Sequence, residues 1–133
     1  MLLVKTTTGP SKIHGTGLFA TELVPKGTIV WRFTPDIDES YSEEEVERLA
    51  EPHRGEVLSF IHSYISKATG KYIWCGDDAR YMNHSEEPNV GMLSQIDGHE
   101  EVNPTLRDVQ PGEELTIDYR TFAADVPADL AYA

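Results

Sequence analysis

The chain has 133 residues, 39% of them hydrophobic and 26% charged, and carries a formal net charge of −12 at pH 7. This length suits one domain around one core, and the acidic excess argues against binding nucleic acid or an anionic membrane, both of which carry negative charge. The lone Cys75 excludes an intramolecular disulfide and a four-thiolate zinc site, and without a signal peptide or a long apolar run we expect a cytoplasmic protein.

Frequent turn signals divide the chain into short segments, which indicates a mainly β protein with few long helices. Between the turns, β-branched, aromatic or alternating apolar residues predict short strands. These strands are expected at Thr28–Phe33, Lys71–Cys75, Glu101–Arg107 and Glu114–Tyr119.

One helix start is explicit in the sequence. Ser42 followed by Glu45 matches a capping box, and we expect the helix to stop near Pro52. Over Arg54–His62 the apolar spacing fits a short helix, while alternation leaves a strand open. The acidic run Asp36–Arg48 is interpreted as part of a solvated insert rather than a binding surface.

The first candidate site is a glycine-rich segment, His14-Gly15-Thr16-Gly17-Leu18-Phe19-Ala20, whose spacing also fits a dinucleotide-binding fingerprint. That fingerprint needs a long following helix, and Pro25 and Gly27 interrupt the chain too soon. What remains is a backbone turn. Such a turn either is purely structural or exposes N–H and C=O groups to a ligand with amino and carboxylate ends.

Two further segments carry polar or aromatic groups. Arg80–Asn89 gathers amides, an imidazole and a hydroxyl in a stretch that Pro88 keeps from being a helix interior, so it is either a site or a self-capped loop. Arg107–Tyr119 is a turn and a strand ending in a phenol, which alone suggests packing. A metalloenzyme is not favoured, because no two histidines have the spacing of a helical zinc site.

Taken in order, three motifs resemble the SET-domain family of protein lysine methyltransferases from about Lys12 to Tyr119. They are Gly-x-Gly-Leu-Phe-Ala, then Arg-Tyr-Met-Asn-His-Ser-x-x-Pro-Asn, then Pro-Gly-Glu-Glu-Leu-Thr-Ile-Asp-Tyr. The resemblance implies several small curved sheets with a C-terminal pseudoknot. We therefore expect one SET domain over residues 1–133, similar to minimal bacterial or viral members, with a short helical insert at about 35–70 and a tail at 120–133.

The resemblance also implies site residues for the cofactor S-adenosylmethionine. Backbone at His14, Gly15, Thr16 and Gly17 would hold its methionine end, with Asn83 and His84 beside that turn. Tyr119 would orient the methyl transfer, and Phe122, in preference to Tyr132, would lie near the adenine.

The chain departs from the family pattern at two places. The tail lacks the cysteines of the family's zinc segment, so no zinc is expected, and Phe33 stands near the place of a frequent second active-site tyrosine.

The expected function is transfer of a methyl group from S-adenosylmethionine to a protein lysine, with a basic segment as the preferred substrate of so acidic a chain. The alternative is a non-catalytic module that keeps the fold and docks a basic protein. The joint presence of Asn83, His84 and Tyr119 favours the enzyme, because a structural role does not need them together.

Overall fold

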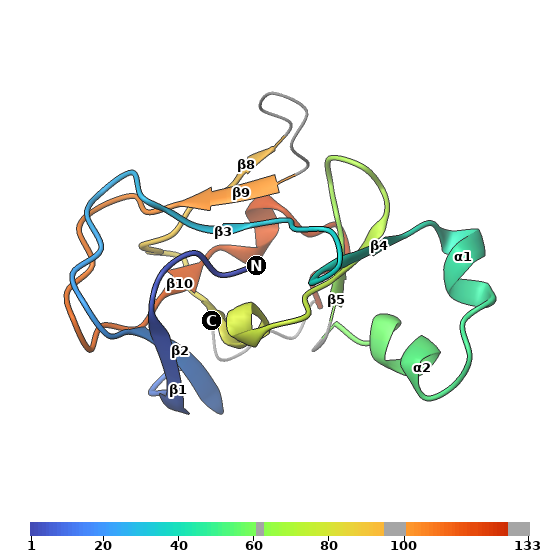
Figure 1. The fold of residues 1–133 in the computed structure, drawn as a ribbon, viewed down its shortest axis with the longest axis horizontal. Coiled ribbons are helices and arrows are strands. Elements are labelled where there is room, and N and C mark those ends of the chain that lie inside the picture. The colour runs from blue at the N-terminus through green and yellow to red at the C-terminus, as the bar shows by residue number, and fades with distance from the viewer. Residues whose placement is uncertain (61–62, 95–100, 128–133) are drawn as a thin grey trace.

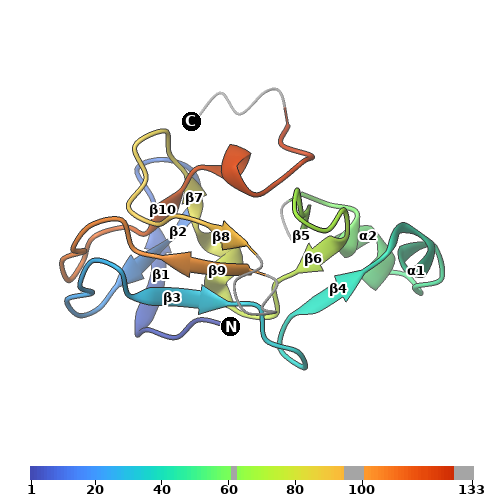
Figure 2. The same ribbon diagram turned by 90° about the horizontal axis from the view of Figure 1, so that it is seen from above.

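The computed structural model of the protein describes residues 1–60, 63–94 and 101–127. Within them the fold is mainly β, with short strands in four small sheets (Figures 1 and 2). The sheet orders are β1-β2, β10-β7, β3-β9-β8 and β4-β6-β5. The strands are β1 (Thr6–Pro10), β2 (Thr16–Ala20), β3 (Ile29–Arg32), β4 (Glu39–Tyr41), β5 (Ser63–Ile65), β6 (Tyr72–Trp74), β7 (Asn83–His84), β8 (Leu93–Ser94), β9 (Glu101–Pro104) and β10 (Thr116–Ile117).

The helical elements are short. They are α1 (Glu43–Glu47), α2 (His53–Val57) and the 3₁₀ turns η1 (Asp78–Tyr81) and η2 (Tyr119–Thr121). Both helices lie with β4, β5 and β6 at one end of the molecule, away from the β1-β2 hairpin (Figures 1 and 2). No helix of the described ranges is long and apolar enough to cross a membrane.

The C-terminal segment is threaded between parts of the chain that are distant in sequence. Leu115 N donates to Leu18 O of β2, and β10 then pairs in parallel with β7. On leaving β7 the chain returns, and Val90 N donates to Thr116 O. The 84–90 connection therefore closes around β10, which is the pseudoknot expected from the family resemblance.

One hydrophobic core holds this crossing together. Leu18, Val30, Val90 and Leu115 are completely buried and come from four separate stretches of the chain. Since burial of apolar surface is the main favourable term in folding, this core stabilises the threaded arrangement.

Several expectations for individual elements are confirmed. Strands form inside all four predicted ranges, and Ser42 and Glu45 make both bonds of the capping box. The helix ends at Glu47 and not near Pro52, because the N–H groups of Arg48 and Leu49 close tight three-residue turns after it.

Two other segments differ from the prediction or decide between the alternatives that the sequence left open. The glycine-rich segment is only partly a turn, since β2 begins at Thr16 and pairs with β1. Over 54–62, α2 takes the first part, β5 begins at Ser63, and Ile61 and His62 lie outside the described residues.

Candidate functional site

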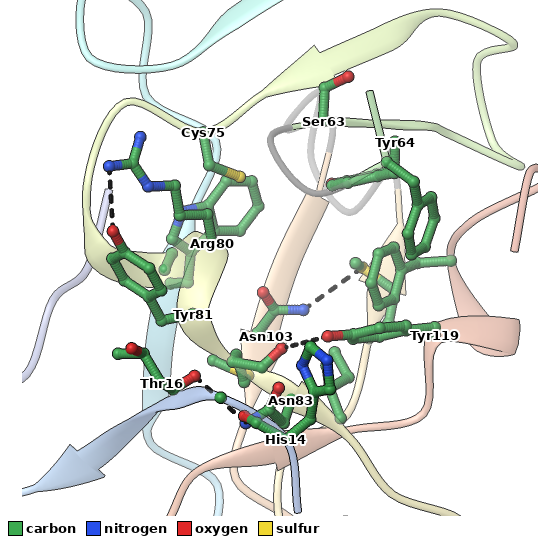
Figure 3. A pocket seen from close by; sticks show the side chains of 18 residues that line it. His14, Thr16, Ser63, Tyr64, Cys75, Arg80, Tyr81, Asn83, Asn103 and Tyr119 are labelled. Atoms are coloured by element: carbon green, nitrogen blue, oxygen red, sulfur yellow. Dashed lines mark hydrogen bonds between the residues drawn. The ribbon is translucent and has the colours of Figure 1, made fainter. Parts of the chain in front are cut away.

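A cavity of about 290 Å³ lies where the hairpin turn, η1, β5, β9 and the C-terminal segment meet. Six of the residues predicted from sequence line it: His14, Gly15, Thr16, Asn83, Tyr119 and Phe122. Figure 3 shows His14, Thr16 and Asn83 together at the bottom of the pocket, with Tyr119 to their right and Tyr64 at the opposite, upper side. The other two, Gly17 and His84, are not among the lining residues.

Asn83 holds the hairpin turn in place. Its Nδ2 lies 3.0 Å from His14 O, 3.3 Å from Thr16 O and 3.1 Å from Glu114 Oε2, and the residue is only 6% exposed. The same Glu114 carboxylate accepts from Ser11 Oγ at 2.8 Å. One amide thus ties the turn to the segment that leads into β10.

Steric constraints explain why glycine stands at both positions 15 and 17. Gly15 has a φ of +46°, in the left-handed region where a side chain is strained. A Cβ on Gly17 would stand 2.9 Å from the Glu114 side chain, closer than real contacts allow. Gly17 therefore lets Glu114 approach the turn, a role that the sequence pattern alone does not reveal.

His84 acts on the backbone next to Tyr119. Its ring is buried, and Nδ1 accepts the Tyr119 N–H at 3.0 Å, so this nitrogen carries no hydrogen. The Tyr119 hydroxyl donates to Met82 O at 2.7 Å. Backbone and phenol of Tyr119 are therefore both anchored on the segment that carries Asn83.

Aromatic rings surround the Tyr119 phenol. Ring centroids lie 5.5 Å away for Phe60 and 6.0 Å for Phe122, both edge-to-face. Phe122 also packs on Tyr64 at 4.6 Å. The transfer point expected at Tyr119 thus has apolar walls, while Tyr132, the other tail aromatic considered, lies outside the described residues.

Asp118 is anchored by the charge of Arg120. The carboxylate accepts from Arg120 Nε at 2.9 Å and from its NH2 at 2.8 Å, and this pairing holds the pKa of Asp118 below its ordinary value. Asp118 also caps η2 through the Arg120 N–H. This pair fixes the start of the tail just after Tyr119.

Tyr64 and Glu101 are site residues that the sequence reasoning missed. Tyr64 lines the cavity, and its hydroxyl donates to the buried Glu101 carboxylate, which also accepts from Ser66 Oγ at 2.6 Å. Phe33, which stands where a second phenol was sought, packs against the buried cluster of Trp31, Ile73 and Cys75 and is not part of the lining. The sequence pattern predicts no strand over Ser63–Ile65, so nothing in it indicates that Tyr64 faces a site.

The described residues contain no group of three or more His, Cys, Asp or Glu side chains able to hold a metal ion. Cys75 is a buried thiol at the cavity, and burial raises its pKa far above the ordinary value. The lining thus offers hydroxyls, amides, aromatic rings, the Cys75 thiol and the Arg80 guanidinium, and the buried Glu101 carboxylate is hydrogen-bonded to Tyr64.

The solved structures similar to this fold include an apo ctPRC2 structure with mutations in Ezh2. It aligns with a TM-score of 0.65 and 25% identity over 96% of this chain and 16% of that chain. A crystal structure of a Plasmodium falciparum protein described as a histone methyltransferase aligns with a TM-score of 0.60 and 19% identity, over 89% of this chain and 95% of that one.

Curated relatives agree with the fold. The chain is 32% identical over 117 residues to the Schizosaccharomyces pombe "Histone-lysine N-methyltransferase, H3 lysine-4 specific", covering 84% of this chain and 12% of the relative. It is 33% identical over 116 residues to the Drosophila virilis "Histone-lysine N-methyltransferase trithorax", covering 83% of this chain and 3% of the relative. The chain therefore spans only a small part of the length of these relatives.

The family comparison covers most of the cavity. Residues 15–120 match the SET domain, a range that includes Gly15, Asn83 and Tyr119 and leaves out His14 and Phe122. With this match and relatives above 30% identity, the chain belongs to the SET-domain family.

Proposed function

We propose that the protein transfers a methyl group from S-adenosylmethionine to a lysine side chain of a protein. The observation that carries the proposal is one cavity that joins the His14–Thr16 backbone, Asn83 and the Tyr119 phenol. The names of the relatives, histone-lysine N-methyltransferases, support the reaction class.

The cavity lining suits S-adenosylmethionine. Aromatic and apolar side chains form most of the wall, which suits the adenine ring and the carbons beside the sulfonium, and polar groups gather at the hairpin turn. A Cβ built on Gly15 meets nothing within 4 Å, so the backbone there is open to a ligand. Trp31, also in the lining, has a buried Nε1 without a partner among the described residues.

Under this proposal each predicted residue has a role. His14, Gly15, Thr16 and Asn83 hold the amino-acid end of the cofactor, and Phe122 covers the adenine. Gly17 and His84 support these contacts from outside the lining, through Glu114 and Tyr119 respectively.

S-adenosylmethionine supplies, when bound, a methyl group on a cationic sulfonium. The residues of the chain position the amine of the target lysine and exclude water from it. They also favour the neutral form of that amine. An ordinary lysine has a pKa of about 10.4, which desolvation in an apolar channel lowers. Tyr119 gives its only hydroxyl hydrogen to Met82 O, so toward the amine its oxygen acts as an acceptor that aligns an amine N–H.

Transfer of a labelled methyl group tests the proposal. The purified chain is incubated with labelled S-adenosylmethionine and basic lysine peptides, including one around histone H3 lysine 4, and products are located by mass spectrometry. Label should appear on lysine and be absent from matched peptides with norleucine at that position. Cofactor and peptide binding without any transfer would instead support the non-catalytic docking module.

We further propose that the substrate lysine lies in a basic segment. The chain has a net charge of −12, and Glu43 and Glu47 are exposed on α1 beside a groove. Charges of opposite sign on a peptide raise its association rate, and salt screens this attraction beyond roughly 8 Å. Added salt should therefore lower kcat/KM for basic peptides and hardly change cofactor affinity.

Two double variants that remove the same charge at different places test whether the acidic residues of α1 produce this attraction. Glu43→Gln with Glu47→Gln should lower kcat/KM for a basic peptide more than Glu22→Gln with Glu87→Gln, which removes the same charge elsewhere on the exposed surface. Glu45 is left unchanged because it belongs to the capping box. Equal, salt-independent rates for basic and neutral peptides would reject steering and leave the methyltransferase proposal intact.

A further inference from the structure

A buried carboxylate lies directly behind the cavity wall. Glu101 begins β9 and is 2% exposed, and its two oxygens accept from the Tyr64 hydroxyl and, at 2.6 Å, from Ser66 Oγ. A carboxylate is costly to bury, even when hydrogen bonds satisfy it. The methyl transfer outlined above makes no use of this group.

Tyr64 connects Glu101 to the cavity. A phenol has one hydrogen, and Tyr64 donates it to Glu101, so its oxygen keeps only acceptor capacity for any other partner. Burial, followed by the Glu101 charge, raises the pKa of Tyr64 well above its ordinary value. The phenol therefore stays protonated, and it can pass on a proton only by receiving another.

The other described titratable groups that act on Tyr64 are poor competitors for such a proton. Cys75 is buried, and its pKa is raised, so it is an uncharged thiol. Asp38 already accepts from the Met1 ammonium, the Thr34 N–H and the Gly76 N–H. Glu101 is the carboxylate in direct contact with the phenol.

We propose that Glu101, acting through Tyr64, accepts the proton that the target lysine must lose, an inference that rests on the lysine methyltransferase function proposed above. The lysine ammonium donates an N–H to the Tyr64 oxygen. One proton then moves from the lysine nitrogen to that oxygen while the original hydroxyl proton moves to Glu101.

The step conserves atoms and charge. An ammonium, a phenol and a carboxylate become a neutral amine, a phenol and a carboxylic acid. After product release the carboxylic acid returns its proton through Tyr64 to water in the cavity. Removing two opposite charges together is favourable where burial penalises each charged form, so the apolar wall assists the transfer.

The relay predicts a distinctive dependence of rate on pH. With a pKa of about 10.4, only about one lysine in 2,500 is neutral in water at pH 7. With Glu101 as acceptor, kcat/KM should change little between about pH 7 and 9. In Glu101→Gln the proton must go to solvent, so kcat/KM should fall about 100-fold at pH 7 and recover about tenfold per pH unit.

Three variants separate this role from a structural one. Tyr64→Phe should show the same steep pH profile, and the double variant should lose no more than either single variant, because both interrupt one relay. Ser66→Ala removes the described hydrogen bond from Ser66 Oγ to Glu101 and should keep the flat profile. A structural role predicts equal losses at every pH. Circular dichroism checks that each variant folds, and Tyr64→Phe serves if Glu101→Gln does not.

An infrared difference spectrum gives a readout without turnover. Binding the lysine peptide that is methylated best should produce a protonated carboxylic acid band in the unmodified chain. The band should be missing in Glu101→Gln and with the norleucine peptide. No transfer to any lysine peptide by the unmodified chain would overturn the methyltransferase proposal and the relay with it. An active unmodified chain whose pH profile matches that of Glu101→Gln, or which lacks the band, would overturn the relay alone.

Discussion

Replacement of Asn83 by alanine should loosen the cofactor end of the cavity. The side chain is 6% exposed, and Nδ2 lies within 3.3 Å of two turn carbonyls and of Glu114 Oε2. Removing it leaves buried acceptors unsatisfied, which costs about 1–3 kcal/mol. The loss should lower the melting temperature by roughly 4 °C per kcal/mol and weaken S-adenosylmethionine binding by about 5- to 150-fold.

Two further variants locate the effect. Asn83→Asp keeps the shape, loses both N–H donors and places a second carboxylate beside Glu114, so at pH 7 it should destabilise the fold more than alanine does. Asn89→Ala also removes a buried amide, one that donates to Glu114 O at 2.8 Å from outside the cavity lining. It should lower stability and leave cofactor affinity nearly unchanged.

Titration calorimetry and thermal unfolding of the three variants provide the measurements. If Asn83→Ala binds S-adenosylmethionine as tightly as the unmodified chain, Asn83 is not part of the cofactor site. If Asn89→Ala weakens binding equally, the effect of Asn83 is one of general stability.

Two other predictions concern the segment after β10. Tyr119→Phe removes the donor to Met82 O and should lower turnover at saturating cofactor by about tenfold or more, with cofactor affinity changed much less; unchanged turnover would remove Tyr119 from its role. The hydrogen bond with Arg120 lowers the pKa of Asp118 in the folded state. The ionised carboxylate therefore contributes its full stabilisation above the unfolded-state pKa of about 3.9, and this contribution disappears as pH falls through the folded-state pKa. Urea unfolding should therefore show Asp118→Asn less stable than the unmodified chain at pH 6, with the difference shrinking below about pH 4; a difference independent of pH would contradict this origin.

Local patterns in the sequence determined much of the secondary structure. The capping box forms as predicted because Ser42 and Glu45 are three residues apart and need no distant partner. The predicted strand ranges all contain strands, since β-branched alternation reports a half-buried strand. The hairpin of β1 and β2 was missed because Thr6–Pro10 has little apolar alternation, and pairing with Thr16–Ala20 makes it a strand.

The order of the three motifs identified the family, and the family implied the pseudoknot. The cytoplasmic location and the single-domain boundaries stay predictions. The motifs did not show which contacts the site residues make. Only the structure shows that His84 anchors the Tyr119 backbone and that Gly17 makes room for Glu114.

Only the tertiary structure decided which distant groups meet. Asn83 bonds His14 O across 69 positions of the chain, and Tyr64 bonds Glu101 across 37. The first contact follows from threading β10 beside β7 over a buried apolar core, and the second from the approach of β5 to the start of β9. Residue type and spacing indicate local backbone preference. From sequence alone a glutamate such as Glu101 is expected at the surface, and only the fold shows that it is enclosed.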